Sequence, residues 1–207
     1  MTLEETFATL LKNYTKDEQL IAGLWEEVAA CYASPNRYYH TLNHLENTLV
    51  QLNAVKGQIK NWNAILFTLY YHDIIYDASK QNNEEESAYL AVKRMKEIAV
   101  PEDLITLCME QIVATKSHLA SVDQDTNYFT DADLSILGQD WDTYGNYYKN
   151  VRLEFQIYPD LQYSFGRRSV LDHFLSMDRI FKTDYFYNRY EARAKENLKK
   201  EMELLQG

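Results

Sequence analysis

Three imidazoles and two carboxylates recur within stretches that otherwise have the pattern of buried helix. They are His40, His44, the adjacent pair His72 and Asp73, and Asp133. The chain has 5 His, so most of its imidazoles stand in these motifs. Burying a charged or strongly polar side chain is costly unless the group is paired or binds a metal. The cluster therefore predicts a metal site, against the plain alternative of unrelated core residues.

The spacing of these residues determines what each could contribute. His40 and His44 are four apart, so they share a helix face if the helix already includes His40. His72 and Asp73 are neighbours and would point about 100° apart on a helix, so a shared ion must lie between them. Imidazole nitrogens with carboxylate oxygens suit a divalent ion such as Mn, Mg, Co, Zn, Fe or Ni. Two His and two Asp would leave positions open for water, as a hydrolytic metal requires.

The elements that must position these residues are helical by their hydrophobic pattern. Residues 62–76 are apolar on all sides except at His72 and Asp73, which is typical of a central buried helix. Further helices are predicted over about residues 41–52, 84–99, 102–115, 141–158, 167–181 and 187–205. No alternating strand pattern, repeat or low-complexity tract occurs, so we expect one all-α domain over residues 1–207.

Local signals place several helix ends. Residues 2–5 and 15–18 both fit the capping box, in which a hydroxyl and a later Glu satisfy free backbone N–H groups. Asn83 is expected to cap the helix over residues 84–99. Gly138 is expected to end the short segment that follows Asp133, because glycine is common at helix C-termini.

Composition limits the class of protein and of partner. The 207 residues suffice for one domain with a proper core. The net charge of −10 repels a nucleic-acid backbone, so we expect no polymeric nucleic acid as partner, although a metal and an Arg could still hold a small phosphorylated molecule. No apolar run reaches the ~20 residues of a membrane span, and the acidic start is unlike a secretory signal. We therefore expect no membrane partner. The two Cys fit no disulfide framework, so we expect a cytoplasmic protein. The oligomeric state stays open.

The order His44, His72-Asp73, Asp133 resembles the signature of the HD superfamily of metal-dependent phosphohydrolases. The sequence segments around these residues are more specific, and they resemble the bacterial "predicted metal-dependent HD superfamily phosphohydrolase" family. The segments are RYYHTLNH at 37–44, HDIIY at 72–76, NEEESA at 83–88, ATKSH at 114–118 and DADLSILG at 131–138. The resemblance covers about residues 37–205. It implies an HD-type helical bundle with a buried metal site, and His44, His72, Asp73 and Asp133 as metal ligands.

A more distant resemblance to cyclic-nucleotide phosphodiesterases suggests roles. Their segment similar to residues 39–44 has a general acid at its first His and a metal ligand at its second. Carried over, His40 would protonate the leaving oxygen, and the metal ligand Asp73 would be the second catalytic residue. Thr41 stands where those enzymes have Asn, so the hydrogen bonding of His40 is not carried over. The alternative is that His40 contacts the substrate or supports one of the metal ligands.

The remaining candidates have less specific signals. His118 and Glu84 are candidates for a second metal or a phosphate contact, although His118 is the only His between the His72-Asp73 pair and Asp133. Arg37 and Arg167 are candidates for binding the substrate's phosphate, because a guanidinium fork matches phosphate oxygens. A structural ion pair is the alternative for an Arg.

Asp131 has two interpretations. Its carboxylate could accept the N–H of a metal-binding imidazole, or it could cap a helix.

Together these features predict a metal-dependent phosphohydrolase. It would cleave a phosphate ester of a nucleotide or another small phosphorylated metabolite through a metal-activated water. One alternative is a metal-containing nucleotide-binding or regulatory module without turnover. The other is a diiron HD-type oxygenase.

Overall fold

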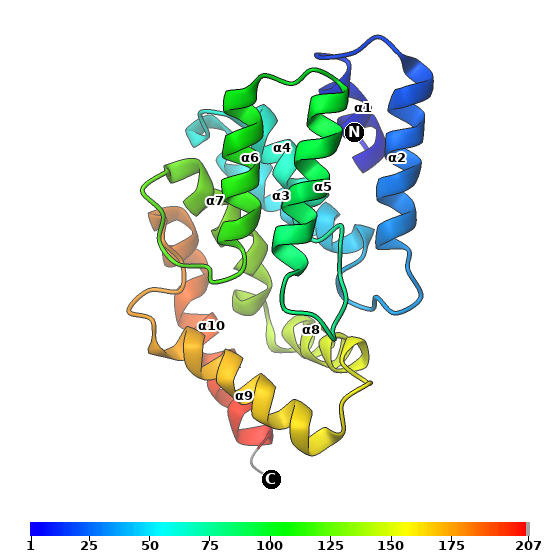
Figure 1. The fold of residues 1–207 in the computed structure, drawn as a ribbon. Coiled ribbons are helices and arrows are strands. Elements are labelled where there is room, and N and C mark those ends of the chain that lie inside the picture. Colours follow the sequence, from blue (N-terminus) through cyan, green and yellow to red (C-terminus); the bar gives the residue numbers. More distant parts are fainter. Residues whose placement is uncertain (206–207) are drawn as a thin grey trace. The chain divides into compact units, whose positions relative to one another are not determined.

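The computed structural model describes residues 1–205, and this part of the chain is helical (Figure 1). It contains ten α-helices and two short 3-10 helices, and residues 1–205 include no strand. The predicted all-α class is therefore confirmed. No helix in this part of the chain combines the length and apolar character that a membrane crossing needs.

The chain divides into two compact units, Met1–Thr130 and Asp131–Gly207. The prediction of one domain over residues 1–207 stays a prediction, because compactness does not decide whether the units fold independently. The first unit contains α1 (Leu3–Leu11), α2 (Glu18–Tyr32), α3 (Leu42–Val55), η1 (Lys56–Gln58), α4 (Trp62–Tyr71), α5 (Asn83–Glu97), α6 (Glu102–Ala114) and most of α7 (Gln124–Asp133).

Helix α4 is the centre of the first unit. It packs against α1, α3, α5 and α6, and α5 and α6, both green in Figure 1, lie side by side. Every side chain of α4 from Ala64 to Tyr71 is buried. The sequence pattern predicted this, because a helix that is apolar on all sides must be covered on all sides.

Helix α4 ends five residues earlier than predicted. His72 follows its last residue as the C-cap, and the chain then turns away. The carbonyl oxygens of Asp73 and Ile74 accept hydrogen bonds from the Arg37 side chain, and the Ile75 N–H donates to Ser87 Oγ. These side chains bind the polar backbone groups that a longer helix would use internally. His72 and Asp73 therefore stand in a turn and not side by side on a helix.

The predicted helix starts in the first unit are partly right. At α1, the Glu5 N–H donates to Thr2 Oγ1 and the Thr2 N–H to Glu5 Oε2, so the first capping box is present. The second, over residues 15–18, is wrong, because Asp17 caps α2 instead and accepts from two N–H groups of its first turn. Asn83 is also not a cap: it is the first residue of α5, and its amide bonds the backbone of Asp77.

The second unit contains η2 (Leu134–Gly138), α8 (Trp141–Glu154), α9 (Asp160–Ser176) and α10 (Asp184–Leu204). Helix α10 packs against η2 and α9, and α8 packs against η2. The helix predicted over residues 141–158 extends too far, because α8 ends at Glu154. The helix predicted over residues 167–181 begins too late, because α9 starts at Asp160, directly after Pro159.

Gly138 ends η2 for a reason other than the predicted one. No glycine in the described residues has a positive φ, so Gly138 does not adopt the left-handed cap conformation. A Cβ at this position would lie 2.5 Å from the Cβ of Tyr190. Glycine is needed here because α10 passes close to the backbone.

Candidate metal centre

Three imidazoles surround the carboxylate of Asp73 in the first unit. Asp73 Oδ2 lies 3.2 Å from His72 Nε2, 3.7 Å from His44 Nε2 and 3.8 Å from His40 Nε2. The side chains of His72 and His44 are buried, whereas those of His40 and Asp73 are each 20% exposed. The cluster therefore has a buried floor and a more accessible side, as a site that admits a small ligand requires.

The tautomer of His72 follows from its backbone contact. His72 Nδ1 lies 3.0 Å from the carbonyl oxygen of Leu69. A carbonyl oxygen can only accept, so Nδ1 carries the proton, and neutral His72 has its lone pair on Nε2. Metal-binding imidazoles are oriented in the same way, by donating their second N–H to a carbonyl or carboxylate. The His72 ring is thus held with its Nε2 toward His44 Nε2, which lies 3.1 Å away.

His40 and His44 do not share a helix. Helix α3 begins at Leu42 after the N-cap Thr41, so His44 lies in its first turn and His40 lies before it. The condition for a shared helix face is therefore not met, although the two ring centroids still lie 5.8 Å apart. The His40 ring packs on Tyr76, with 4.3 Å between the ring centroids.

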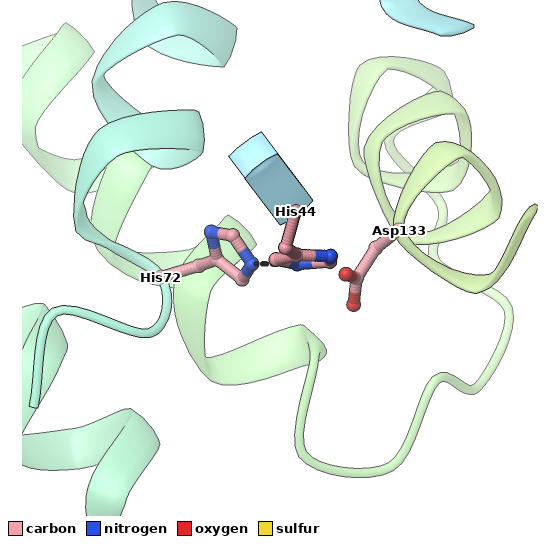
Figure 2. A group of neighbouring side chains, drawn as sticks. All are labelled: His44, His72 and Asp133. Atoms are coloured by element: carbon pink, nitrogen blue, oxygen red, sulfur yellow. Dashed lines mark hydrogen bonds between the residues drawn. The ribbon is translucent and has the colours of Figure 1, made fainter. Parts of the chain in front are cut away.

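Asp133 is placed by helix α7, of which it is the last residue. One turn earlier, the Phe129 ring packs edge-on against His72, with 5.4 Å between the centroids. Residues four apart lie on the same face of a helix, so Asp133 follows Phe129 toward the imidazoles. One ligand atom each of His44, His72 and Asp133 lies within 4.8 Å of the other two, as Figure 2 illustrates. In the described part of the chain, these residues form a largely buried group that could hold a metal ion.

The donor set fits a divalent transition metal. Two imidazole nitrogens with carboxylate oxygens suit Zn, Fe, Mn or Co, and Asp73 lies close enough to both rings to add a further oxygen. The metal's identity stays a prediction.

Arg37, a candidate for binding the substrate's phosphate, binds backbone carbonyls in this structure. Its guanidinium is buried and donates to three carbonyl oxygens: those of His40 at 3.2 Å, Asp73 at 2.7 Å and Ile74 at 2.8 Å. The group also lies over the rings of Tyr32 and Tyr76. Arg37 therefore joins the segment before α3 to the turn after α4, and so fixes His40 relative to Asp73.

Arg167, the other candidate for binding the substrate's phosphate, has a carboxylate partner within the protein. It lies in α9 of the second unit, where its guanidinium forms a buried two-pronged ion pair with Glu201 of α10, at 2.7 and 3.0 Å. The Tyr144 hydroxyl also donates to Glu201. The structural ion pair that is the alternative for an Arg is thus present at Arg167.

Two weaker candidates lie outside the metal-binding group. Glu84 Oε2 is 3.9 Å from Lys116 Nζ, at the start of α5. His118 lies in the loop after α6, with a left-handed φ of 53°. Neither belongs to a group of three potential ligands in the described residues, so nothing in the structure favours a second metal.

Asp131 takes neither predicted role. Helix α7 begins at Gln124, so Asp131 is not its cap. Its carboxylate accepts from the backbone N–H of Lys182 at 2.9 Å, and from the N–H and hydroxyl of Thr183 at 2.7 Å each. These are protein N–H and O–H donors and not imidazoles, so Asp131 anchors the segment that leads into α10.

The sequence pattern gives no signal for Lys182, which stands between Phe181 and Thr183 without a motif. Its side chain is only 6% exposed, and its Nζ lies 3.2 Å from Asp131 Oδ1. Burial lowers the pKa of Lys182, and the nearby carboxylates of Asp131 and Asp133 oppose this shift.

Comparison with known proteins adds no family assignment. No protein-family model, no curated protein and no solved structure matches this chain. Function is therefore inferred from the three imidazoles that surround Asp73 and from the helix end that carries Asp133.

Proposed function

We propose that this chain is a metal-dependent phosphohydrolase of the HD superfamily. Its substrate would be a phosphate ester of a nucleotide or another small phosphorylated metabolite. The observation that carries the proposal is the convergence of three imidazole Nε2 atoms on one carboxylate oxygen of Asp73, all within 3.8 Å. The order His44, His72-Asp73, Asp133 along the chain supports the same family.

His44, His72, Asp73 and Asp133 would hold the divalent ion. Bound there, the ion would supply a Lewis acid that acidifies a water molecule and offsets the charge of the phosphate. The chain itself prepares the ligands: the Leu69 carbonyl orients His72, and Arg37 holds the backbone on both sides of the cluster. Such preorganisation lets the ligands bind without a large rearrangement.

His40 is proposed as the general acid. It is the imidazole of the cluster that is a fifth exposed, so it can exchange protons with solvent. Its Nε2 lies 3.8 Å from Asp73 Oδ2, close to where a leaving oxygen would be bound. Stacking on Tyr76 fixes the plane of the ring. A positioned acid of this kind contributes about 10²- to 10⁴-fold to the rate.

The experiment is a phosphate-release assay with Mn or Co, on p-nitrophenyl phosphate, its diester and a panel of nucleotides. Turnover by the wild type is expected, with His40→Gln losing about 10²-fold or more in kcat while keeping its metal. Asp73→Asn should lose both metal and activity. The exposed His173 of α9 provides the control, His173→Gln. Thermal stabilisation by metal and nucleotide without any released phosphate would overturn the proposal in favour of a binding module.

A further inference from the structure

The buried guanidinium of Arg37 has donors that the protein does not use. A guanidinium has five N–H donors. Nη1 donates to the carbonyl oxygens of His40 and Asp73, and Nη2 donates to that of Ile74. Within residues 1–205 the Nε–H has no acceptor, and none is found for the second N–H of Nη2. Nε and Nη2 are neighbours on one edge of the planar group, and each has an N–H to spare for a ligand.

The charge of this guanidinium is also unbalanced. Arg37 is only 8% exposed, and no carboxylate of residues 1–205 forms an ion pair with it. Its partners are carbonyl oxygens and the faces of the Tyr32 and Tyr76 rings, which carry only partial charges. Buried charges in proteins are ordinarily paired with an opposite charge. The site therefore favours a negatively charged partner.

A cavity beside Arg37 has room for a small molecule. Its volume is about 410 Å³, within the ~300–1,000 Å³ of ligand sites. The lining belongs entirely to the first unit: Ala30, Cys31, Ser34 and Arg37 lie at and after the end of α2, and residues 74–76 lie in the turn after α4. The described lining combines hydrogen-bond donors with apolar side chains and includes no acidic residue.

Two acidic groups near this cavity do not supply the missing charge. Glu27 is close enough to affect Cys31, but its carboxylate accepts from Arg94 at 2.6 and 2.8 Å. Burial raises the pKa of the Cys31 thiol, so the thiol is uncharged at neutral pH. An anion from solution is thus the remaining source of a charge that balances Arg37.

A carboxylate matches this site better than a phosphate. Its two oxygens accept two parallel N–H groups from a guanidinium, and its single negative charge balances the single positive charge of Arg37. A phosphate group carries about −1.5 to −2 at neutral pH, so part of its charge would stay unbalanced in a largely buried site. The side chains of Ala30, Ile74 and Ile75 in the lining suit the carbon part of an organic acid.

We propose that this cavity binds a small organic acid, whose carboxylate accepts from Nε and Nη2 of Arg37 while its carbon chain packs on Ile74 and Ile75. The site goes beyond the proposed hydrolase function and does not depend on it. The alternative is that Arg37 is purely structural and that its carbonyl partners alone hold its charge.

Cys31 provides a reporter for this site, because it lines the cavity whereas Cys108 is fully buried. The experiment measures the rate at which N-ethylmaleimide alkylates Cys31 in the full chain, at constant ionic strength. Acetate, butyrate and benzoate are each compared with their neutral amides, and calorimetric titration gives the affinities. We expect an acid to slow alkylation until the effect saturates, its amide to leave the rate unchanged, and inorganic phosphate to protect less than the best acid.

The variant Arg37→Lys tests the guanidinium itself. It keeps the positive charge and removes the two-donor edge, so we expect the acid to bind at least about 10-fold more weakly. Arg179→Lys in the second unit is the matched control, because Arg179 pairs with the exposed Asp184. It should bind the acid as the wild type does.

Equal protection by an acid and its amide would overturn the inference, because the cavity would then recognise only the carbon chain. No protection by any of the acids, or stronger protection by phosphate than by every acid, would overturn it as well. Unchanged acid affinity in folded Arg37→Lys would show that Arg37 does not recognise the carboxylate. Should Arg37→Lys not fold, the difference between acid and amide in the wild type decides.

Discussion

The Nε2 atoms of His44 and His72 lie 3.1 Å apart, and in neutral His72 the single ring proton is on Nδ1, which donates to the Leu69 carbonyl. Two imidazole lone pairs cannot face each other at this distance without a proton or a cation between them. A proton on His44 Nε2 would satisfy only this one contact. A metal ion between the two nitrogens would also have the carboxylates of Asp73 and Asp133 nearby. The proposed metal site therefore depends first on this pair of nitrogens.

Arg37 is predicted to act on stability and metal affinity and not on substrate binding. Arg37→Met removes the donors for the carbonyls of Asp73 and Ile74, so we expect a loss of about 2–4 kcal/mol in the free energy of unfolding. Metal affinity should fall as well, because the turn that carries Asp73 is released. Urea unfolding and metal titration measure the two effects.

A matched control for Arg37 is Arg179→Met. Arg179 pairs with Asp184, whose side chain is 88% exposed, so this pair should contribute less than about 1 kcal/mol. An Arg37→Met variant with wild-type stability and a raised KM would instead support the original phosphate-contact prediction.

Arg167 should behave as a purely structural residue. Arg167→Met leaves Glu201 buried beside the Tyr144 hydroxyl without its cation, which should cost about 3–5 kcal/mol in urea unfolding. KM for phosphate esters, measured under conditions where the variant is folded, should not change. A raised KM with unaltered stability would instead support the predicted phosphate contact of Arg167.

Buried tyrosines should make the protein sensitive to alkaline pH. Burial raises the pKa of Tyr70 and of Tyr71 above their ordinary value. Below about pH 10 the hydroxyls are protonated in both states; above it the unfolded chain ionises first, so stability falls as pH rises toward the folded-state values. Each such group contributes up to about 1.4 kcal/mol per pH unit to this fall.

Tyr70→Phe tests this linkage. It removes the hydrogen bond from the Tyr70 hydroxyl to the Leu3 carbonyl and should cost about 1 kcal/mol at neutral pH. Between pH 10 and 11 its stability should fall less steeply than that of the wild type, as urea unfolding at several pH values would record. The exposed Tyr89 supplies the control Tyr89→Phe, and equal slopes in all three proteins would count against the linkage.

The two thiols should react differently. Cys108 is fully buried in α6, and burial raises the pKa of its thiol to about 12. Cys31 is only partly buried. Ellman's reagent at pH 8 should therefore label Cys31 in the native protein and both thiols in urea. Rapid native labelling of Cys108, compared in a Cys31→Ser variant, would contradict the described packing of α6 against α4.

The residues of the candidate site could be predicted from the sequence because their types are costly to bury without a purpose. The structure gathers His44, His72 and Asp133 into one group, and it places Asp73 beside the two imidazoles. The central position of α4 was also predictable, since its apolar residues leave no exposed face. The end of α4 was not, because no Gly or Pro marks it and the turn depends on Arg37, which is far away in the chain.

The roles of the cations could not be read from the sequence for the same reason. A guanidinium that binds three carbonyls looks the same in sequence as one that binds a phosphate, and only the fold brings the carbonyls of Asp73 and Ile74 to Arg37. Lys182 depends on a contact with Asp131 over 51 residues. Pro159 was a local signal for the start of α9, but none of residues 160–166 is buried, so the first turns of α9 have no core-facing apolar pattern.

The most direct test of the central claim is the metal content of the protein purified without chelator. About one divalent ion per chain is expected in the wild type and in the control His173→Ala, and none in His72→Ala or His44→Ala. All four proteins should be folded by circular dichroism. Full metal in folded His72→Ala would contradict the account, because the nitrogen that Leu69 orients would then not be a ligand.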